Sequence, residues 1–170
     1  MVVKPLVGAG SKDTGRYDLG RPAERAEAVG LAERILAGGR GVVVQPYLTG
    51  VDVEGETALV HVDGRLSHAV RKAALLTGPA GDVAGLYVEE RTAACAPTAA
   101  QRAVAAQALA TVAGDGPPLY ARVDVLPGPD GAPVVLEVEL TEPSLFLGHD
   151  RGAADRLAGA IADRVRPRVV

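Results

Sequence analysis

The stretch LYARVDVLPGPDGAPVVLEVEL, Leu119–Leu140, decides the fold because it has the pattern of one antiparallel hairpin. Apolar and charged residues alternate in Leu119–Leu126 and again in Val134–Leu140. Successive side chains of a strand point to opposite faces of a sheet. The intervening Pro127–Pro133 contains an Asp-Gly pair, which is a strong hairpin signal. We therefore expect two paired strands with one apolar face and one charged face.

The charged face of this hairpin gathers three carboxylates and one arginine. With the Asp-Gly pair in the turn, Asp124 lies opposite Glu137, and Arg122 lies opposite Glu139. Because like charges that face each other are unfavourable, Asp124 and Glu137 need a cation between them. Oxygen ligands with no histidine or cysteine nearby favour Mg²⁺ or Mn²⁺ over zinc. The hairpin therefore predicts a metal site formed by Asp124, Glu137 and Glu139.

A second interpretation of the same face is open. In this second interpretation, the charged face is a solvated surface that holds an ion pair between Arg122 and Glu139. The register matters, because a one-residue slip of one strand would move its charged set to the other face. The opposite face is expected to be core: Val123, Val125, Leu136, Val138 and Leu140.

An earlier hairpin is predicted around Asp63-Gly64, which joins Glu56–Val62 to Arg65–Lys72. If that pair forms the turn, Glu56 faces Arg71 and Leu59 faces His68. His61 and His68 then share the face of Leu59, and we expect both to be packed or hydrogen-bonded histidines, not metal ligands.

The remaining segments mix strands and helices, so the fold class is α+β, with an antiparallel sheet built from two hairpins and packed with helices. Further strands are expected at Val2–Lys4, Gly41–Leu48 and Leu86–Arg91, and helices at Pro22–Ala37, Thr98–Ala113 and Ala153–Arg164. Their apolar stripes are expected at Val29, Ala32, Ile35 and Leu36; at Ala100, Val104, Ala108 and Val112; and at Leu157, Ile161 and Val165.

The composition suits one globular domain over residues 1–170. A formal charge of −3 disfavours nucleic-acid binding, which needs a basic surface. A single cysteine, Cys95, excludes an internal disulfide and a multi-cysteine metal site. No apolar run approaches the ~20 residues of a membrane span, and the chain starts without a secretory signal. We expect a cytoplasmic protein that binds neither nucleic acid nor membrane.

The segment after the first strand, Val7–Gly20, is polar and rich in glycine. Exposed backbone N–H groups of such a loop, with Lys4 and Lys12 nearby, suit phosphate binding. The spacing matches neither a Walker loop nor a dinucleotide fingerprint. A flexible loop without a ligand is the alternative.

Taken in order, these segments resemble the ATP-grasp carboxylate–amine ligases, in their glutathione-synthetase-like branch. The resemblance covers nearly the whole chain. It rests on VKPLVGAGS at Val3–Ser11, VQPY at Val44–Tyr47, EGETAL at Glu54–Leu59, GRLSHAVRK at Gly64–Lys72, YARVD at Tyr120–Asp124 and LEVELTEPSLFL at Leu136–Leu147.

The resemblance implies a role for each matching position. Lys4 and the loop residues Gly8, Gly10 and Ser11 would contact the phosphates of ATP. The linker residues Gln45, Pro46, Tyr47 and Leu48 would line the adenine pocket. Lys72 and Arg122 would be phosphate-facing cations. The magnesium or manganese ligands would be Asp124, Glu137 and Glu139, and Glu139 stands where many relatives have asparagine.

The resemblance also implies a reaction, in which ATP phosphorylates a carboxylate and an amine then attacks the acylphosphate. The expected substrates are ATP and a small carboxylate such as an amino acid or peptide. Relatives carry an N-terminal domain and a small lobe before the strand that corresponds to Val2–Lys4, so the chain is expected to be N-terminally truncated. A homo-oligomer, or a missing lobe supplied in trans, would complete it. A non-catalytic nucleotide-binding module and an α+β interaction domain are the alternatives.

Overall fold

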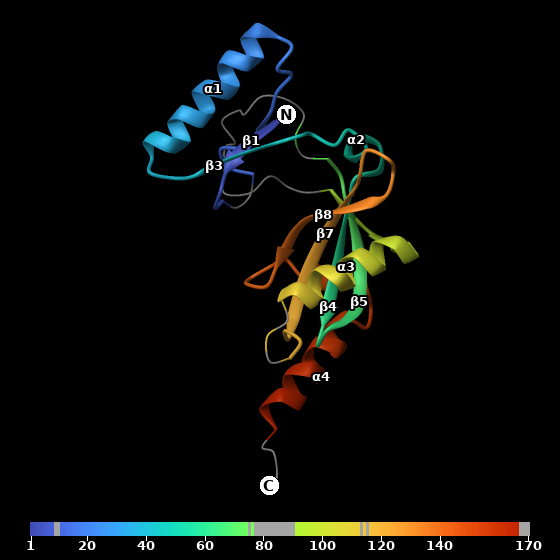
Figure 1. Cartoon of the computed structure of the whole chain (residues 1–170). Helices are drawn as coiled ribbons and strands as arrows, with labels where there is room; N and C mark the ends of the chain where they lie inside the picture. Colours follow the sequence, from blue (N-terminus) through green and yellow to red (C-terminus); the bar gives the residue numbers. More distant parts are fainter. Residues whose placement is uncertain (9–10, 75, 77–90, 113, 115, 167–170) are drawn as a thin grey trace. The chain divides into compact units, whose positions relative to one another are not determined.

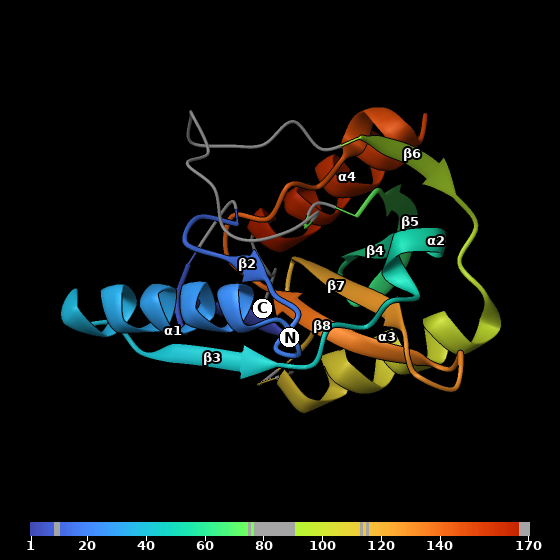
Figure 2. The same ribbon diagram turned by 90° about the horizontal axis from the view of Figure 1, so that it is seen from above.

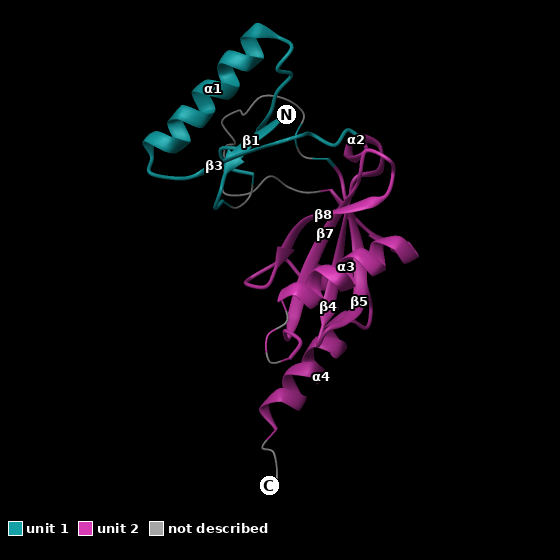
Figure 3. Cartoon of the chain, in the orientation of Figure 1, with its two compact units in different colours: residues 1–49, 74–90 teal, residues 50–73, 91–170 magenta. Residues whose placement is uncertain are grey.

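A computed structural model describes residues 1–8, 11–74, 76, 91–112, 114 and 116–166. Its contacts divide the chain into two compact units (Figure 3), Met1–Thr49 with Ala74–Glu90 and Gly50–Ala73 with Arg91–Val170. Both units combine helices with antiparallel strands, which confirms the α+β class (Figure 1). None of the helices in the described ranges is long and apolar enough to cross a membrane. That residues 1–170 form a single domain stays a prediction.

The first unit is a three-stranded sheet with one helix. Strands β1 (Val2–Pro5), β2 (Gly15–Arg16) and β3 (Val42–Gln45) lie in the order β2-β1-β3, and both pairings are antiparallel. Helix α1 (Pro22–Ala37) runs beside this sheet (Figure 2) and has the predicted bounds. Proline is tolerated in the first turn of a helix, where its missing N–H costs no hydrogen bond. The short β2 was not expected within the glycine-rich loop.

The core of the first unit differs in part from the predicted helix stripe. Val3, Tyr17, Ala28, Leu31 and Ile35 are buried together. The prediction was right for Ile35, whereas Val29 and Leu36 are 52% and 58% exposed. The strand after α1 is shorter than expected and is not fully buried, since Val44 is 55% exposed.

The second unit is a five-stranded antiparallel sheet in the order β6-β5-β4-β7-β8. The strands and helices are α2 (Val51–Glu54), β4 (Glu56–Val62), β5 (Arg65–Lys72), β6 (Thr92–Cys95), α3 (Ala99–Val112), β7 (Tyr120–Pro127), β8 (Pro133–Glu139), the 3₁₀ helix η1 (Leu147–His149) and α4 (Ala153–Val165). The strand predicted at Leu86–Arg91 lies almost wholly outside the described residues, and β6 was not expected.

Helix α3 covers one face of this sheet, and the main core lies between them. The buried members are Leu59, Ala69, Ala105, Leu109, Ala121, Val123 and Val125. The predicted α3 stripe is wrong at its ends, because Ala100 and Val112 are exposed. Leu140 was expected in the core and is 39% exposed. The predicted stripe of α4 is largely exposed, at Ile161 and Val165.

The first hairpin has the predicted strand bounds, but its register changes along its length. Near the turn His61 pairs with Leu66, as expected. A bulge then leaves Ser67 unpaired, so that Val60 pairs with His68 and Glu56 pairs with Lys72. The predictions that Glu56 faces Arg71 and Leu59 faces His68 are therefore wrong, because an extra residue re-aims the side chains beyond it.

The second hairpin has the predicted register where it matters for the site. Arg122 pairs with Glu139 and Asp124 pairs with Glu137. The turn itself is one residue away from the predicted one, since Gly131 N donates to Gly128 O at 3.0 Å and the central residues are Pro129 and Asp130. A bulge at Leu136, which no residue of β7 faces, restores the predicted pairs. The shift of the turn and the bulge at Leu136 are each one residue, so they cancel, and the pairs beyond the bulge have the predicted register.

Candidate functional site

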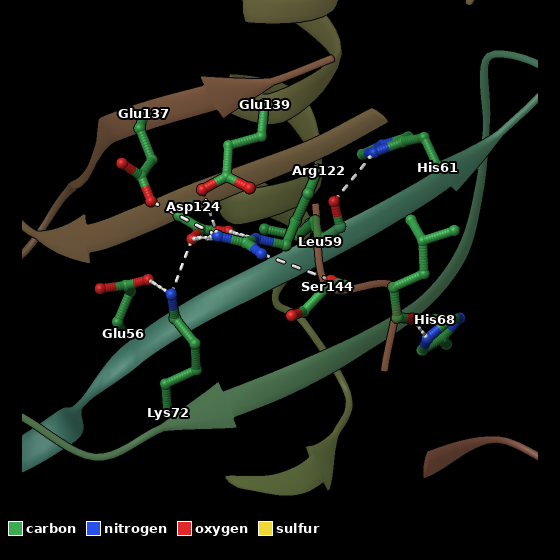
Figure 4. Close-up of polar contacts among 11 residues, drawn as sticks. Glu56, Leu59, His61, His68, Lys72, Arg122, Asp124, Glu137, Glu139 and Ser144 are labelled. Carbon is green, nitrogen blue, oxygen red and sulfur yellow. Dashed lines mark hydrogen bonds and ion pairs between the residues drawn. The ribbon is translucent and has the colours of Figure 1, made fainter. Parts of the chain in front are cut away.

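Asp124 is the centre of the charged face, and its side chain is fully buried. The Lys72 ammonium lies 2.8 Å from its Oδ2, and Arg122 Nε donates to its Oδ1 at 2.8 Å. Arg122 Nη2 also donates to Oδ2, at 2.9 Å. The three side chains come from β5 and β7 and point toward one another (Figure 4). A buried carboxylate between two cations is strongly held, because removal of either partner leaves an uncompensated charge.

Arg122 connects Asp124 to the second strand of its hairpin and to the chain beyond it. Its Nη2 donates to Glu139 Oε1 at 2.6 Å and lies 3.4 Å from Glu137 Oε1. Its Nη1 donates to the backbone carbonyl of Ser144 at 3.3 Å. The guanidinium carbon lies 5.6 Å from the centre of the Phe146 ring, which is within range of a cation–π contact. The guanidinium is thus fixed on several sides.

Glu56 belongs to this cluster, although the sequence did not suggest it. It forms an ion pair with Lys72, and its side chain is 16% exposed. One carboxylate oxygen from each of Glu56, Asp124 and Glu137 lies within 4.8 Å of the other two. Glu139 lies outside this group of three and accepts a hydrogen bond from Arg122, and its role as a metal ligand stays a prediction. The bulge that brings Glu56 opposite Lys72 has no plain sequence signal, which is why Glu56 was missed.

The central ion pairs keep their charges. Burial alone would raise the pKa of Asp124, but Lys72 and Arg122 hold it below its usual value. Burial would lower the pKa of Lys72, yet the carboxylates of Asp124 and Glu56 raise it. Burial would lower the pKa of Arg122, yet the carboxylates of Asp124, Glu139 and Glu137 together raise it. Lys72 therefore stays an ammonium and Asp124 a carboxylate at neutral pH.

The outer carboxyl groups behave differently. Burial raises the pKa of Glu56 to about 8, with Lys72 opposing and Asp124 reinforcing the shift. Burial and the charges of Asp124 and Glu139 raise the pKa of Glu137 to about 7. The Glu137 side chain is 42% exposed, so water screens part of this effect. Near neutral pH these two groups hold protons that a divalent cation would displace.

Two predicted nucleotide-binding residues share a face of the first unit's sheet. The pairs of β1 and β3 put Lys4 and Gln45 on the face opposite Val3 and Val42, which pack with α1. Pro46, Tyr47 and Leu48 follow β3 directly, Gly8 is exposed just after β1, and Ser11 adopts a left-handed conformation. Gly10 lies outside the described residues.

Arg16 lies on the same face of this sheet and was not singled out from the sequence. It pairs with Val2, which in turn pairs with Gln45, so the three form one row across the sheet. Its guanidinium carbon lies 3.8 Å from the centre of the Tyr47 ring. This contact links the end of the glycine-rich loop to the predicted adenine linker. That these residues and the charged cluster serve one nucleotide stays a prediction.

Comparisons with known proteins bear on both units. A scan against protein families finds no match. The cycloserine biosynthesis protein DcsG of Streptomyces lavendulae is 45% identical over 172 residues, which cover 98% of this chain and 55% of that protein. The crystal structure of D-cycloserine synthetase DcsG is similar with a TM-score of 0.83 and 42% identity, over 97% of this chain and 55% of that one.

Two more distant solved structures share the fold. The D-alanine–D-alanine ligase of Bacillus anthracis, complexed with ATP, has a TM-score of 0.60 and 22% identity, over 95% of this chain and 50% of that one. The ATP-grasp ligase PsnB, complexed with minimal precursor, Mg and ADP, has a TM-score of 0.59 and 22% identity, over 97% and 46% of the two chains. The chain spans about half the length of the curated relative that it matches.

Proposed function

Because this chain belongs to the ATP-grasp superfamily of ligases, we propose that it is the ATP- and metal-binding part of an ADP-forming ligase. The observation that carries the proposal is the convergence of Glu56, Asp124 and Glu137, with two cations beside them. Metal-bound nucleotide needs both kinds of group, since carboxylates hold the ion and cations face the phosphates. A solvated charged face does not account for an aspartate that is fully buried.

The chemistry of the donor set fits magnesium or manganese. All candidate ligands are carboxylates, and the described residues bring no histidine or cysteine into the group. Glu56 Oε1 is buried and pairs with the Lys72 ammonium, so this oxygen already faces a cation. We assign Asp124, Glu137 and Glu139 as ligands and add Glu56. The bound ion would neutralise charge on the nucleotide phosphates.

Lys72 and Arg122 would act on the phosphoryl group that is transferred. Both are held by Asp124 and so are oriented before a nucleotide arrives. Preorganised cations stabilise charge that develops in a transition state without the cost of reorganising at that moment. In the reaction a substrate carboxylate oxygen attacks the γ-phosphorus, and the bond to the leaving ADP breaks. An amine then attacks the acyl carbon and expels phosphate.

The carboxylate substrate is proposed to be an amino acid, or a compound derived from one. The similar protein DcsG is described as a D-cycloserine synthetase, one more distant protein is named a D-alanine–D-alanine ligase, and another is complexed with a minimal precursor. The part of these relatives beyond the matched half would supply the remaining contacts, in the same polypeptide, in trans or from a second copy.

Calorimetric titration with Mg²⁺ and ATP tests the nucleotide-binding step. We expect wild type to bind, and Glu137→Gln to lose binding while the fold is kept, because Glu137 is partly exposed. Asp124→Asn should also lose binding, at a cost in stability. Glu33→Gln is the matched control, since it removes the same charge from an exposed position of α1. Wild type that fails to bind, or Glu137→Gln that binds like wild type, would reject the assignment.

A second candidate function is a nucleotide-binding module without ligase activity of its own. It is favoured by the coverage, since the chain corresponds to about half of the relative. The two functions separate in a turnover assay that measures ADP release with and without added D-alanine. Release that depends on the amino acid supports a ligase, and ATP binding without such release supports the module.

A further inference from the structure

The chain directly after β8 is tied to the charged face of the sheet at consecutive residues. We call Ser144–Phe146 the 144–146 segment. Arg122 Nη1 donates to the Ser144 carbonyl at 3.3 Å, and His68 Nε2 lies 2.9 Å from the Leu145 carbonyl. The Phe146 ring adds the cation–π contact with Arg122. Two side chains from different strands thus hold one short segment.

His68 and Arg122 can share this task because they lie in one row across the sheet. Val60 of β4 pairs with His68 on one side and with Arg122 on the other. Residues in such a row point to the same face. His68 has this orientation because Ser67 is the extra residue of the bulge, and a bulge re-aims the side chain that follows. His68 therefore lies on the charged face.

The hydrogen bonds around His68 define its protonation. The Leu145 carbonyl only accepts, so His68 Nε2 carries the proton and donates. Burial lowers the pKa of His68, so the ring is neutral near pH 7 and Nδ1 is an acceptor for the Ser67 hydroxyl at 3.0 Å. Ser67 Oγ in turn accepts from Arg156 Nε at 2.8 Å. Successive hydrogen bonds therefore connect Arg156 of α4, through Ser67 and His68, to the 144–146 segment.

The segment needs such support because its backbone is strained. Phe146 in the segment and Glu142 just before it adopt left-handed conformations, with φ of 47° and 50°. A bulky residue such as phenylalanine is rarely found there, and its conformation persists only where surrounding contacts impose it. Loss of one anchoring bond would let the segment relax, and the Ser144 carbonyl would then leave Arg122.

We propose that His68 is a positioning residue that acts through the 144–146 segment on Arg122. By holding Leu145 against β5, it keeps the Ser144 carbonyl and the Phe146 ring in the places where they orient the Nη1 edge of Arg122. The Nη2 edge is already occupied by carboxylates. The Nη1 edge is therefore the part of Arg122 that meets the phosphoryl oxygens of the nucleotide. The inference rests on the proposed nucleotide-binding function.

His61 provides a matched control on the same hairpin. It is 4% exposed, compared with 8% for His68, and its Nδ1 lies 3.1 Å from the Leu59 carbonyl of its own strand. It faces the α3 side of the sheet, where it lines a cavity of 390 Å³ together with Leu66 and Leu109. A substitution there removes a buried imidazole without touching the 144–146 segment.

The experiment compares wild type with His68→Leu, His68→Gln and His61→Leu, in MgATP affinity and in hydrogen exchange of residues 141–149. We expect His68→Leu to weaken MgATP binding about tenfold, because the cation that meets the phosphates is misplaced. It should also speed exchange in that segment. His68→Gln keeps a donor and should restore both readouts. His61→Leu should match wild type in both.

The outcomes separate this inference from the proposed function. Wild type that does not bind MgATP rejects the proposed function itself. Wild type that binds, with His68→Leu binding equally well, rejects only the role of His68. Equal losses in His68→Leu and His61→Leu also overturn it, since they indicate a general loss of stability. Failure of His68→Gln to restore binding rejects a role that depends on the donated hydrogen bond.

Discussion

The two central hairpins are built alike, yet their sequences were not equally informative. Each carries one extra residue in its second strand, Ser67 in β5 and Leu136 in β8. In β4–β5 the predicted turn is right and the bulge displaces the far end. In β7–β8 the predicted turn is one residue away and the bulge restores the far end. Turn chemistry therefore fixes register only as far as the next bulge.

Both bulges are needed to assemble the site. The first places Lys72 opposite Glu56, and the second places Glu137 opposite Asp124. Because β4 pairs with β7, the charged ends of the two hairpins meet on one face. Bulges are common next to active sites, where they re-aim a side chain. We therefore expect the positions of the site residues in each hairpin to depend on the register of that hairpin.

The largest expected effect comes from Asp124, the buried centre of the second hairpin. Asp124→Asn leaves Lys72 and Arg122 without their shared counter-charge, and we expect a loss of about 3 kcal/mol in the free energy of unfolding. Urea denaturation measures it. Glu139→Gln, at a side chain that is 32% exposed, should cost about 1 kcal/mol or less. Equal costs would show that burial does not distinguish the two carboxylates.

The sequence predicted the elements of these hairpins better than the faces of the helices. Alternating patterns located β4 and β5 at their observed bounds. In α3 the predicted stripe was right only at Val104 and Ala108, which pack against the core. The sequence AAQRAVAAQALATV offers little contrast between its faces, and the buried residues are Ala105 and Leu109. The packing of β7 and β8 against α3 selects that face, and no local pattern encodes it.

Most of the site followed from one strand pair, whereas Glu56 did not. Arg122, Asp124, Glu137 and Glu139 were grouped by alternation and an assumed Asp-Gly turn, and the structure groups them too. Glu56 joins them through a bulge and through the pairing of β4 with β7, which are far apart in the sequence. Non-local pairing is set by the whole fold, so reading each hairpin separately did not reveal it.

A double-mutant cycle between Glu56 and Lys72 sharpens the comparison for the first hairpin. Both side chains are buried and paired, so we expect a coupling free energy of about 2 kcal/mol between Glu56→Gln and Lys72→Met. The matched cycle uses Arg71→Met, because Arg71 is the partner that the turn alone predicts. Arg71 instead donates to the Glu54 carbonyl, and its coupling to Glu56 should be within about 0.5 kcal/mol of zero.

These cycles are measured by urea denaturation of each single and double variant. A larger coupling for Arg71 than for Lys72 would contradict the bulge and restore the register that the Asp-Gly turn implies.

The pH dependence of stability tests the difference between the outer and central carboxyl groups. The pKa of Glu56 is about 8 in the folded protein, raised from 4.5. Its contribution to the free energy of unfolding is therefore fully present below the unfolded pKa and is lost as pH rises toward 8. The metal-free chain should lose about 1 kcal/mol per pH unit from Glu56 across this window. Glu137, whose pKa is raised to about 7, adds a smaller loss that water screens in part. The lowered pKa of Asp124 acts oppositely, on the acid side.

Denaturation of wild type and Glu56→Gln at pH 5.5, 6.5, 7.5 and 8.5, about one unit apart, measures this slope. The variant should have a shallower slope, since Gln does not titrate, while Glu33→Gln should keep that of wild type. If the free energy of unfolding of Glu56→Gln fell with pH as steeply as that of wild type, a group other than Glu56 would be responsible for the pH dependence.

The smallest expected effect is the difference in cost between alanine substitutions in the two turns, about 1 kcal/mol. Gly64 and Gly131 both have positive φ, 73° and 81°, so alanine is strained at either position. A Cβ at Gly64 would lie 2.7 Å from Pro117 Cβ, whereas a Cβ at Gly131 meets nothing within 4 Å. We expect Gly131→Ala to cost about 1 kcal/mol and Gly64→Ala about 2 kcal/mol in thermal or urea unfolding.

The difference between these two costs isolates the contact with Pro117, because the backbone penalty is common to both. Pro117 leaves no room for a side chain at Gly64, so the first turn is closely packed at this point. The turn at Gly131 is open, and the pairing in β7–β8 reaches the predicted register only beyond the bulge. Equal costs would mean that Pro117 moves to make room for the new side chain.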